Sequence, residues 1–358
     1  MAVAEPIDLR AVLERLLEGA HLSESEAAEL LSALTDASLP PAMAGALLAA
    51  LRAKGVAAAE LRGFAQRMRA LARRPELPPL ADAVDIVGTG GDRSGSLNLS
   101  TGAALLAAAC GVPVFKHGNR SISSRAGSAD VLEALGLPLP LDEQAAGRCF
   151  AELGFTFLFA PYYHAATKSI APVRAALGVR TVFNVLGPLS NPAAPPFLVL
   201  GAFDASTAEL MAQALQGSHV QRAFVIHGAE GWDEPTPVGE FTLFDVGTQG
   251  VRREQRSPGD YGLPRCESSE LLGADAAHNA RELRRVLGGA SGGALRDPHR
   301  DALLLGAALA LEVSGHERAP RQALARAAQA IDSGAARELL VRLERFGADE
   351  MRRRTRSA

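Results

Sequence analysis

Several polar segments of the sequence contain residue types suited to holding an anionic ligand. The first reads DIVGTGGD over residues 85–92 and continues as NLST over residues 98–101. Glycines let a backbone approach a ligand closely, and a helix beginning at NLST would offer free N–H groups to phosphate. Arg93 excludes the dinucleotide pattern GxGxxG, and the lack of a lysine excludes a Walker A loop. By itself this segment predicts either phosphate binding or a plain tight turn.

The second segment, residues 116–124, reads KHGNRSISS and follows a predicted strand. It gathers two cations, one amide and three hydroxyls around Gly118. Such donors at the carboxyl end of a strand in an α/β sheet suit an anionic ligand. A polar loop held by its own hydrogen bonds is the alternative interpretation of this segment.

A later segment, residues 227–234, reads HGAEGWDE and ends in two adjacent carboxylates, Asp233 and Glu234. Mg²⁺ prefers one or two protein carboxylates, completed by water and by phosphate oxygens of a substrate. Beside segments that gather phosphate, the pair therefore predicts a magnesium site. Without those segments, a solvated acidic turn would explain it equally well.

The elements that must position these residues change character along the chain. The pattern of the N-terminal part of the chain predicts helices only. Ser23 and Glu26 are expected to form a capping box at the start of one of these helices. A proline-rich stretch at residues 73–79 predicts a linker, after which strands and helices alternate. The predicted helices span residues 9–17, 24–34, 43–53, 60–72, 100–110, 130–135, 205–215, 301–313 and 321–331, and the predicted strands span residues 83–87, 112–115, 155–159, 197–201 and 223–227.

This order of elements predicts an α/β protein with a small all-helical N-terminal domain. The larger domain is expected to hold a mainly parallel sheet flanked by helices. We expect the helical domain to cover residues 1–76 and the α/β domain residues 77–350. Residues 351–358 are expected to form a basic, solvated and frayed tail.

Composition excludes several classes of protein. The 358 residues are 47% hydrophobic, and 37 Lys and Arg against 40 Asp and Glu give a net charge of −3, so neither nucleic acid nor an anionic membrane is attracted globally. The apolar stretches are too short to span a bilayer, and no signal peptide is expected. Three separated cysteines, without a CxxC pair, fit a reducing cytoplasm. We therefore expect a cytoplasmic protein that binds neither nucleic acid nor membrane.

In order and approximate spacing, the polar segments resemble the anthranilate phosphoribosyltransferase family of tryptophan biosynthesis. The resemblance rests on GTGGD, NLST, KHGNRSISS, PVRAALGVRTVFNVLGPLSNP and HGAEGWDE, and it covers nearly the whole chain. It implies a fold of the nucleoside phosphorylase-like phosphoribosyltransferase type. It also implies a homodimer formed through the helical domains, to which a segment near residues 165–190 would add helices.

The resemblance further implies a reaction and a set of site residues. The 5-phosphoribosyl group of phosphoribosyl diphosphate (PRPP) would pass to the amine of anthranilate and release diphosphate, and two Mg²⁺ ions are expected with the diphosphate. PRPP would be bound by Gly88, Gly91, Asp92, Ser96, Asn98, Leu99, Ser100, Thr101, Lys116, His117, Gly118, Asn119, Arg120, Ser121, Ile122, Ser123, Ser124 and Ser128. Anthranilate would be bound by Gly88, His117, Asn119, His164 and Arg174, and magnesium by Ser100, Asp233 and Glu234.

The implied reaction explains why no general acid or base is assigned. The glycosidic C–O bond breaks through an oxocarbenium-like transition state, and diphosphate leaves readily once Mg²⁺ and N–H donors offset its charge. The attacking aryl amine is already neutral at pH 7, so positioning and electrostatics are expected to carry the catalysis. Arg174 suits the anthranilate carboxylate because a guanidinium can pair with it through two hydrogen bonds.

Other functions remain open at this stage. A pyrimidine nucleoside phosphorylase shares the implied fold, but it typically has a further C-terminal domain and a different phosphate motif. A non-catalytic paralogue that binds nucleic acid would be expected to have lost KHGNR or the Asp233–Glu234 pair and to have gained basic charge. A related enzyme could also use a different aromatic acid as the acceptor.

Overall fold

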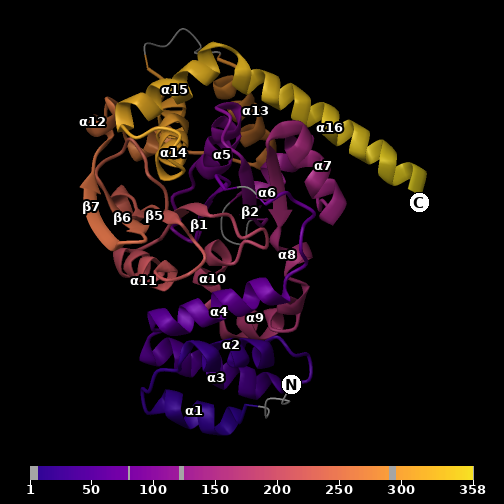
Figure 1. Ribbon diagram of the computed structural model, residues 1–358, viewed down its shortest axis with the longest axis vertical. Coiled ribbons are helices and arrows are strands. Elements are labelled where there is room, and N and C mark those ends of the chain that lie inside the picture. Colours follow the sequence, from indigo (N-terminus) through magenta and orange to yellow (C-terminus); the bar gives the residue numbers. More distant parts are fainter. Residues whose placement is uncertain (1–6, 80, 121–124, 290–295, 358) are drawn as a thin grey trace.

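The computed structural model describes residues 7–79, 81–120, 125–289 and 296–357. At one end of the molecule, four N-terminal helices pack on one another (Figure 1). They are α1 (Leu9–Leu17), α2 (Glu24–Leu34), α3 (Pro41–Lys54) and α4 (Ala58–Leu71). The predicted capping box is present at the start of α2, where Ser23 and Glu26 each accept the backbone N–H of the other. It satisfies two N–H groups that the first turn of a helix leaves without partners.

A seven-stranded sheet forms the centre of the larger domain, in the order β3-β2-β1-β4-β5-β6-β7. Neighbouring strands from β3 to β5 are parallel, whereas β6 and β7 are antiparallel additions at one edge. The strands are β1 (Val84–Gly88), β2 (Val114–Gly118), β3 (Phe155–Phe159), β4 (Phe197–Gly201), β5 (Arg222–His227), β6 (Phe241–Gly247) and β7 (Gly250–Arg256). The predicted α/β class with a mainly parallel sheet is thus confirmed.

Helices cover both faces of the sheet (Figure 1). The sheet divides two hydrophobic clusters because side chains alternate along a strand. In β4, Leu198 and Leu200 face the cluster that includes the N-terminal helices, whereas Val199 faces the cluster of the C-terminal helices. The helices of this part are α5 (Leu99–Ala109), α6 (Ser128–Ala134), α7 (Glu143–Leu153), α8 (Ala160–Tyr163), α9 (Ala171–Leu177), α10 (Phe183–Leu189), α11 (Ala205–Leu215), α12 (Pro258–Tyr261), α13 (Ala276–Leu287), α14 (Pro298–Val313), α15 (Pro320–Asp332) and α16 (Ala335–Ser357), with 3₁₀ turns at Ala165–Lys168, Ala229–Gly231 and Ser268–Leu271.

Helices α9 and α10 connect the sheet to the N-terminal helices, although they follow β3 in the chain. Ile170, Phe183 and Leu186 belong to the same hydrophobic cluster as α1 to α4. Helix α9 contacts α3, and α10 contacts α4 and lies between it and the sheet (Figure 1). The loops at the carboxyl ends of the strands therefore face the N-terminal helices.

The end of the chain differs from the frayed basic tail expected for residues 351–358. Helix α16 continues through Ser357, and Arg354 donates hydrogen bonds to the carbonyls of Pro138 and Pro140. One turn earlier, Glu350 is buried and forms an ion pair with Arg148 of α7. These contacts stabilise the helical conformation of the basic residues, because Arg354 and Glu350 of the helix both have polar partners on the α/β domain. No helix in the described part of the chain is long and apolar enough to cross a membrane.

The strand order reverses direction between β1 and β4, and another loop approaches the ends of both strands closely. The last residues of the two strands, Gly88 and Gly201, are paired in register. A Cβ atom on Gly201 would lie 1.5 Å from the backbone oxygen of Asp233, and one on Gly88 would lie 2.3 Å from the Asp233 carboxylate. Both positions require glycine because the Asp233 loop crosses directly over the strand ends. In open α/β sheets, ligands bind at such a reversal point, outside the carboxyl ends of the strands.

Replacing Gly201 by alanine should destabilise the protein by about 1 to 3 kcal/mol, because the new methyl group would displace the backbone of Asp233. Gly247→Ala is the matched control, since nothing lies within 4 Å of its added Cβ. Urea unfolding of the two variants gives the comparison. Equal unfolding midpoints for Gly201→Ala and the control would show that the loop can move away at no cost.

Candidate active site

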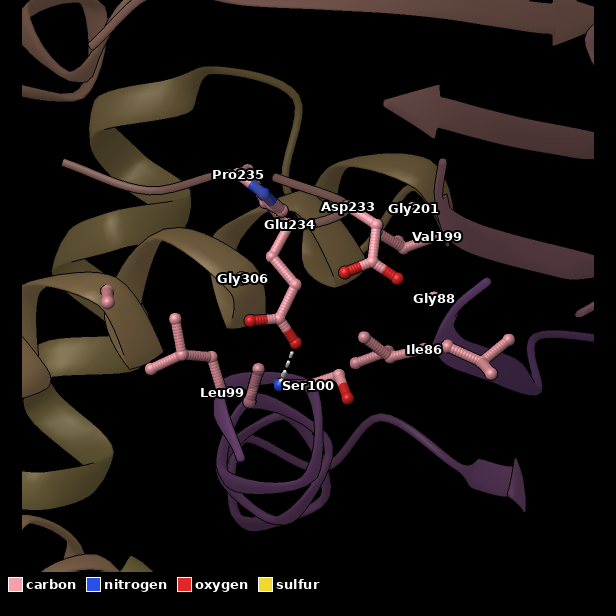
Figure 2. Close-up of a pocket in the computed structure, with 13 residues that line it drawn as sticks. Ile86, Gly88, Leu99, Ser100, Val199, Gly201, Asp233, Glu234, Pro235 and Gly306 are labelled. Carbon is pink, nitrogen blue, oxygen red and sulfur yellow. Dashed lines mark hydrogen bonds between the residues drawn. The ribbon is translucent and has the colours of Figure 1, made fainter. Parts of the chain in front are cut away.

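Two adjacent carboxylates fasten the glycine-rich loop after β1 to the start of α5. Asp233 Oδ2 accepts the backbone N–H of Gly90 at 2.5 Å. Glu234 Oε1 accepts the backbone N–H of Ser100 at 3.0 Å, and Figure 2 shows both carboxylates directed toward β1 and α5. The structure therefore brings three predicted segments, residues 85–92, 98–101 and 227–234, to one place.

Negative charge is concentrated and only partly balanced at this place. Burial, together with repulsion from Asp92, raises the pKa of Asp233 to about 7. Burial and repulsion from Asp233 and Asp92 also raise the pKa of Glu234 well above its usual value. Glu234 Oε2 is buried without a hydrogen-bond partner among the described residues. Such a pair of carboxylates would be stabilised by a cation.

The oxygen donors fit magnesium better than a metal held by protein ligands alone. Within the described ranges, no group of three or more His, Cys, Asp or Glu side chains is arranged to hold a metal ion. Asp233, Glu234 and the hydroxyl of Ser100 line one pocket and supply only oxygen ligands. Mg²⁺ accepts such incomplete sites because water and substrate phosphates fill its remaining positions.

The side chain of Lys116 is buried beneath the site and does not project into the pocket. Its ammonium group donates to the carbonyl of Ile86 at 2.5 Å and lies 3.4 Å from Ser100 Oγ, and the residue is 1% exposed. Burial lowers its pKa to about 8, and the negative charges of Asp85 and Glu234 oppose this shift. In this arrangement Lys116 balances carboxylates, and its ammonium does not reach toward the solvent side, where a phosphate would arrive.

Asp85, in the middle of β1, was not predicted as a functional residue, yet it organises the neighbouring strand. Its carboxylate accepts the backbone N–H of His117 at 3.1 Å and the side-chain amide of Asn191 at 2.8 Å. Asn191 also donates to the carbonyl of Phe115. Burial raises the pKa of Asp85 to about 6, with Lys116 opposing the shift. A charged residue inside an apolar strand was the sequence signal that could have revealed this network.

His117 and His164 form a buried pair on the side of the site nearest α10. Their rings meet edge to face with centroids 5.1 Å apart, and His117 Nδ1 lies 3.1 Å from the carbonyl of Gly187. Both nitrogens of His164 and Nε2 of His117 are buried without partners in the described chain. Burial lowers the pKa of His117 to about 3 and that of His164 to about 4, so both rings are neutral at pH 7.

Arg174 lies on α9, a short helix that contacts α3 of the N-terminal domain. Its guanidinium carbon is 5.1 Å from the ring centroid of Phe183, and partial burial lowers its pKa. Among the described residues its guanidinium makes no hydrogen bond or ion pair. The five N–H donors of this side chain are therefore available to a planar anion.

The other predicted PRPP residues are mostly held by contacts within the protein. Asn98 donates to the carbonyl of Ala126 and accepts from Asn279, which was not predicted. Ser96 Oγ accepts from Ser94, and Ser128 Oγ donates to the carbonyl of Asn119. Gly91, Asp92, Leu99, Thr101 and Gly118 lie in or beside the same loops and strand ends, whereas Ser121, Ile122, Ser123 and Ser124 lie outside the described residues.

Arg120 departs most from its expected role. Its guanidinium forms two hydrogen bonds with Glu133, at 2.5 and 2.6 Å, and one with Asp130 at 2.8 Å, both on α6. These exposed ion pairs occupy the donors that the prediction reserved for phosphate. In the structure, the side chain therefore contacts α6, and its guanidinium carbon also lies 5.6 Å from the ring centroid of Phe159.

The pocket between the loops also has an apolar wall that the sequence did not indicate. Ile86, Val199, Ala302 and Gly306 line the pocket together with the carboxylates, Gly88 and Ser100. In Figure 2, Val199 lies beside Asp233 and Gly306 beside Glu234. Trp232, the residue before Asp233, is 4% exposed and packs into the hydrophobic core instead of lining the acceptor side. Its buried indole anchors the acidic loop in that core.

Comparison with known proteins agrees with this fold and site. A family model described as the helical bundle domain of a glycosyl transferase family matches residues 10–72, and the corresponding a/b domain model matches residues 80–337. These matches define the class as a two-domain glycosyl transferase.

Comparison with individual relatives identifies the family more specifically. The chain is 47% identical over 339 residues to anthranilate phosphoribosyltransferase from Desulforudis audaxviator, covering 94% of this chain and 96% of that one. The crystal structure of the enzyme from Thermus thermophilus matches with a TM-score of 0.88 at 41% identity, covering 96% and 100% of the two chains. The Saccharomyces cerevisiae enzyme in complex with PRPP and Mg matches with a TM-score of 0.85 at 27% identity, covering 95% and 98%.

The chain therefore belongs to the anthranilate phosphoribosyltransferase family. Members of this family are transferases of tryptophan biosynthesis that move a phosphoribosyl group onto anthranilate. The resemblance found in the sequence is confirmed, and the matches support neither a nucleoside phosphorylase nor a nucleic-acid-binding paralogue.

Acidification should destabilise the protein through the two buried histidines. A histidine whose folded pKa is about 4 stays neutral while the unfolded chain takes up a proton below pH 6.5, so stability is lost as pH falls toward 4. Between pH 7 and pH 5, His164 should contribute a loss of about 1 to 2 kcal/mol. Urea unfolding at both pH values should show a smaller loss for His164→Leu than for the wild type. The exposed His278→Leu serves as control, and an unchanged pH dependence in His164→Leu would contradict a neutral His164.

Proposed function

We propose that this chain transfers the 5-phosphoribosyl group from PRPP to the amine of anthranilate in the pocket above β1 and β4. The observation that carries the proposal is the fastening of two phosphate-type loops by Asp233 and Glu234. The yeast relative solved with PRPP and Mg, and the same enzyme solved with 4-fluoroanthranilate, support this choice of substrates. A site built from glycine loops, helix starts and carboxylates suits a diphosphate carried with a cation.

On the donor side, Ser100, Asp233 and Glu234 would hold Mg²⁺, and we propose two ions because the two carboxylates fasten different elements. Bound Mg²⁺ would offset the negative charge of the leaving diphosphate. The protein's own contribution is to keep the glycine-rich loop and the start of α5 at a fixed separation. Lys116 would stabilise the buried carboxylates from below, because its ammonium lies against Ser100 and Ile86.

On the acceptor side, the neutral imidazoles of His117 and His164 and the guanidinium of Arg174 would surround anthranilate. Unpartnered ring nitrogens on both histidines are available to the amine or the carboxylate. Neutral rings also avoid placing positive charge beside an oxocarbenium-like centre. No residue is assigned as general acid or base, since the aryl amine attacks in its neutral form.

We also propose that two copies pair through the N-terminal helices, where Leu17 of α1 is 65% exposed. Residues 1–76 would form the helical domain and α9 and α10 would extend it, since they share its hydrophobic cluster. The three cysteines are free and buried, which agrees with a reducing cytoplasm. The net charge of −3 favours small-molecule partners over nucleic acid.

Removing magnesium should abolish turnover, and Asp233→Asn should weaken Mg²⁺-dependent PRPP binding about tenfold or more, because one of few metal ligands loses its charge. Trp232 is the only tryptophan in the chain and precedes Asp233, so its fluorescence can report binding without the acceptor. Titrating Mg²⁺ at saturating PRPP gives the number of ions. The exposed Glu240→Gln is the control carboxylate. Full activity in excess chelator would remove the magnesium assignment.

Arg174→Ala should raise KM for anthranilate by roughly ten- to a hundredfold, because a hydrogen bond to a charged partner contributes about 1.5 to 3 kcal/mol. PRPP binding without acceptor should change little. The loss of anthranilate fluorescence during turnover measures the first quantity, and Trp232 fluorescence measures the second. Lys168→Ala, which removes an exposed cation nearby, should leave both unchanged. Equal weakening of both substrates would mean that Arg174 organises the cleft instead of binding the carboxylate.

A further inference from the structure

Arg180 lies between α9 and α10 and contacts the loops that follow two different strands. Its Nη2 donates to the carbonyl of Gly91 at 2.6 Å, in the glycine-rich loop after β1. Its guanidinium carbon lies 3.7 Å from the ring centroid of Phe203, just after β4. The side chain therefore contacts the loops after both β1 and β4, the two strands between which the strand order reverses.

The backbone of Arg180 is itself anchored to the N-terminal helices. Arg52 on α3 donates from Nη1 to the carbonyl of Arg180 at 2.6 Å. A continuous path of contacts thus runs from α3 through Arg180 to Gly91. The same connection between α9 and α10 begins only a few residues after Arg174, which faces the acceptor side.

Two groups from different segments of the chain, the Asp233 carboxylate and the Arg180 guanidinium, hold the glycine-rich loop at two successive residues. The N–H of Gly90 binds Asp233, and the carbonyl of Gly91 binds Arg180. Both glycines have positive φ angles, +68° and +79°, which side-chain-bearing residues rarely adopt. A loop of this kind has many alternative conformations, so the two contacts select one of them.

We propose that Arg180 is a positioning residue that holds the glycine-rich loop in the shape that binds PRPP and links this shape to the acceptor side. The inference rests on the proposed function, because it takes this loop to be the donor site. A guanidinium is suited to the task since it stacks on an aromatic ring and donates in its own plane at the same time. A lysine can replace the charge but cannot reproduce both contacts.

Arg180→Ala should raise the dissociation constant of Mg²⁺·PRPP, followed by Trp232 fluorescence without acceptor, by about tenfold. KM for PRPP should rise similarly, while KM for anthranilate at saturating PRPP should change less than about threefold. Arg180→Lys should recover only part of the loss. Arg253→Ala is the matched control, because that exposed arginine also stacks on a phenylalanine, Phe244, but on a distant strand.

Phe203→Leu separates positioning from direct contact with phosphate. It leaves the Arg180 charge in place and removes the stacking surface, so PRPP binding should still weaken about threefold. The double variant should be no weaker than Arg180→Ala, because the two side chains act on one loop. Thermal unfolding of each variant shows whether the fold is retained, and Phe203→Leu carries the test if Arg180→Ala does not fold.

Three outcomes would overturn the proposal or its basis, and they can be told apart. Wild-type PRPP affinity in Arg180→Ala would show that the contact with Gly91 does not matter. Weakening in Arg180→Ala together with wild-type affinity in Phe203→Leu would make Arg180 a direct phosphate ligand. A wild-type protein that binds Mg²⁺·PRPP but does not consume anthranilate would refute the proposed function instead, and the effect of Arg180 on donor binding would still be measurable.

Discussion

The backbone of Asp233 lies against the carboxyl ends of β1 and β4, and the position of every other group in the site depends on this approach. It is possible only because Gly88 and Gly201 present no side chain there. With the loop in this position, the Asp233 carboxylate accepts the N–H of Gly90. The carboxylate of the next residue, Glu234, accepts the N–H of Ser100 in the first turn of α5. A parallel sheet supplies the same edge for all strand ends, so one close contact brings segments that are far apart in sequence into one pocket.

The same approach creates an electrostatic requirement. Asp233 and Glu234 are buried near Asp92, and their raised pKa values express the cost of placing negative charges together in a region of low dielectric. The protein balances part of this charge with Lys116, whose ammonium is itself buried and close to Asp85. The remaining charge faces the pocket. A cation carried in with a diphosphate would meet it there, so the site would stabilise the proposed metal–substrate complex.

Local sequence signals predicted much of the fold because they have direct physical causes. The capping box at Ser23 defined the start of α2, and the apolar runs at Phe155–Phe159 and Phe197–Gly201 matched β3 and β4 as the structure has them. Strands β6 and β7 were not predicted. The sequence of β7, GVRREQR, is charged and lies at the exposed edge of the sheet, so it lacks the apolar run that marks a buried strand. The site motifs were found from composition, but side-chain directions were not. The ammonium of Lys116 binds the carbonyl of Ile86 on the neighbouring strand β1, whereas Arg120 binds Glu133 on α6, the next helix of the chain.

The groups proposed to bind anthranilate belong to different layers of the molecule, and this separation gives the connection between α9 and α10 its importance. His117 is on β2 of the sheet, whereas Arg174 is on a helix that shares its hydrophobic cluster with the N-terminal helices. A reaction between two bound substrates needs these layers at a fixed distance, because small displacements of reacting atoms cost large factors in rate. Hydrophobic packing of α10 against α4 joins these layers but does not determine the shape of a glycine loop. Directed contacts must do so, and Arg180 makes one of them with the carbonyl of Gly91.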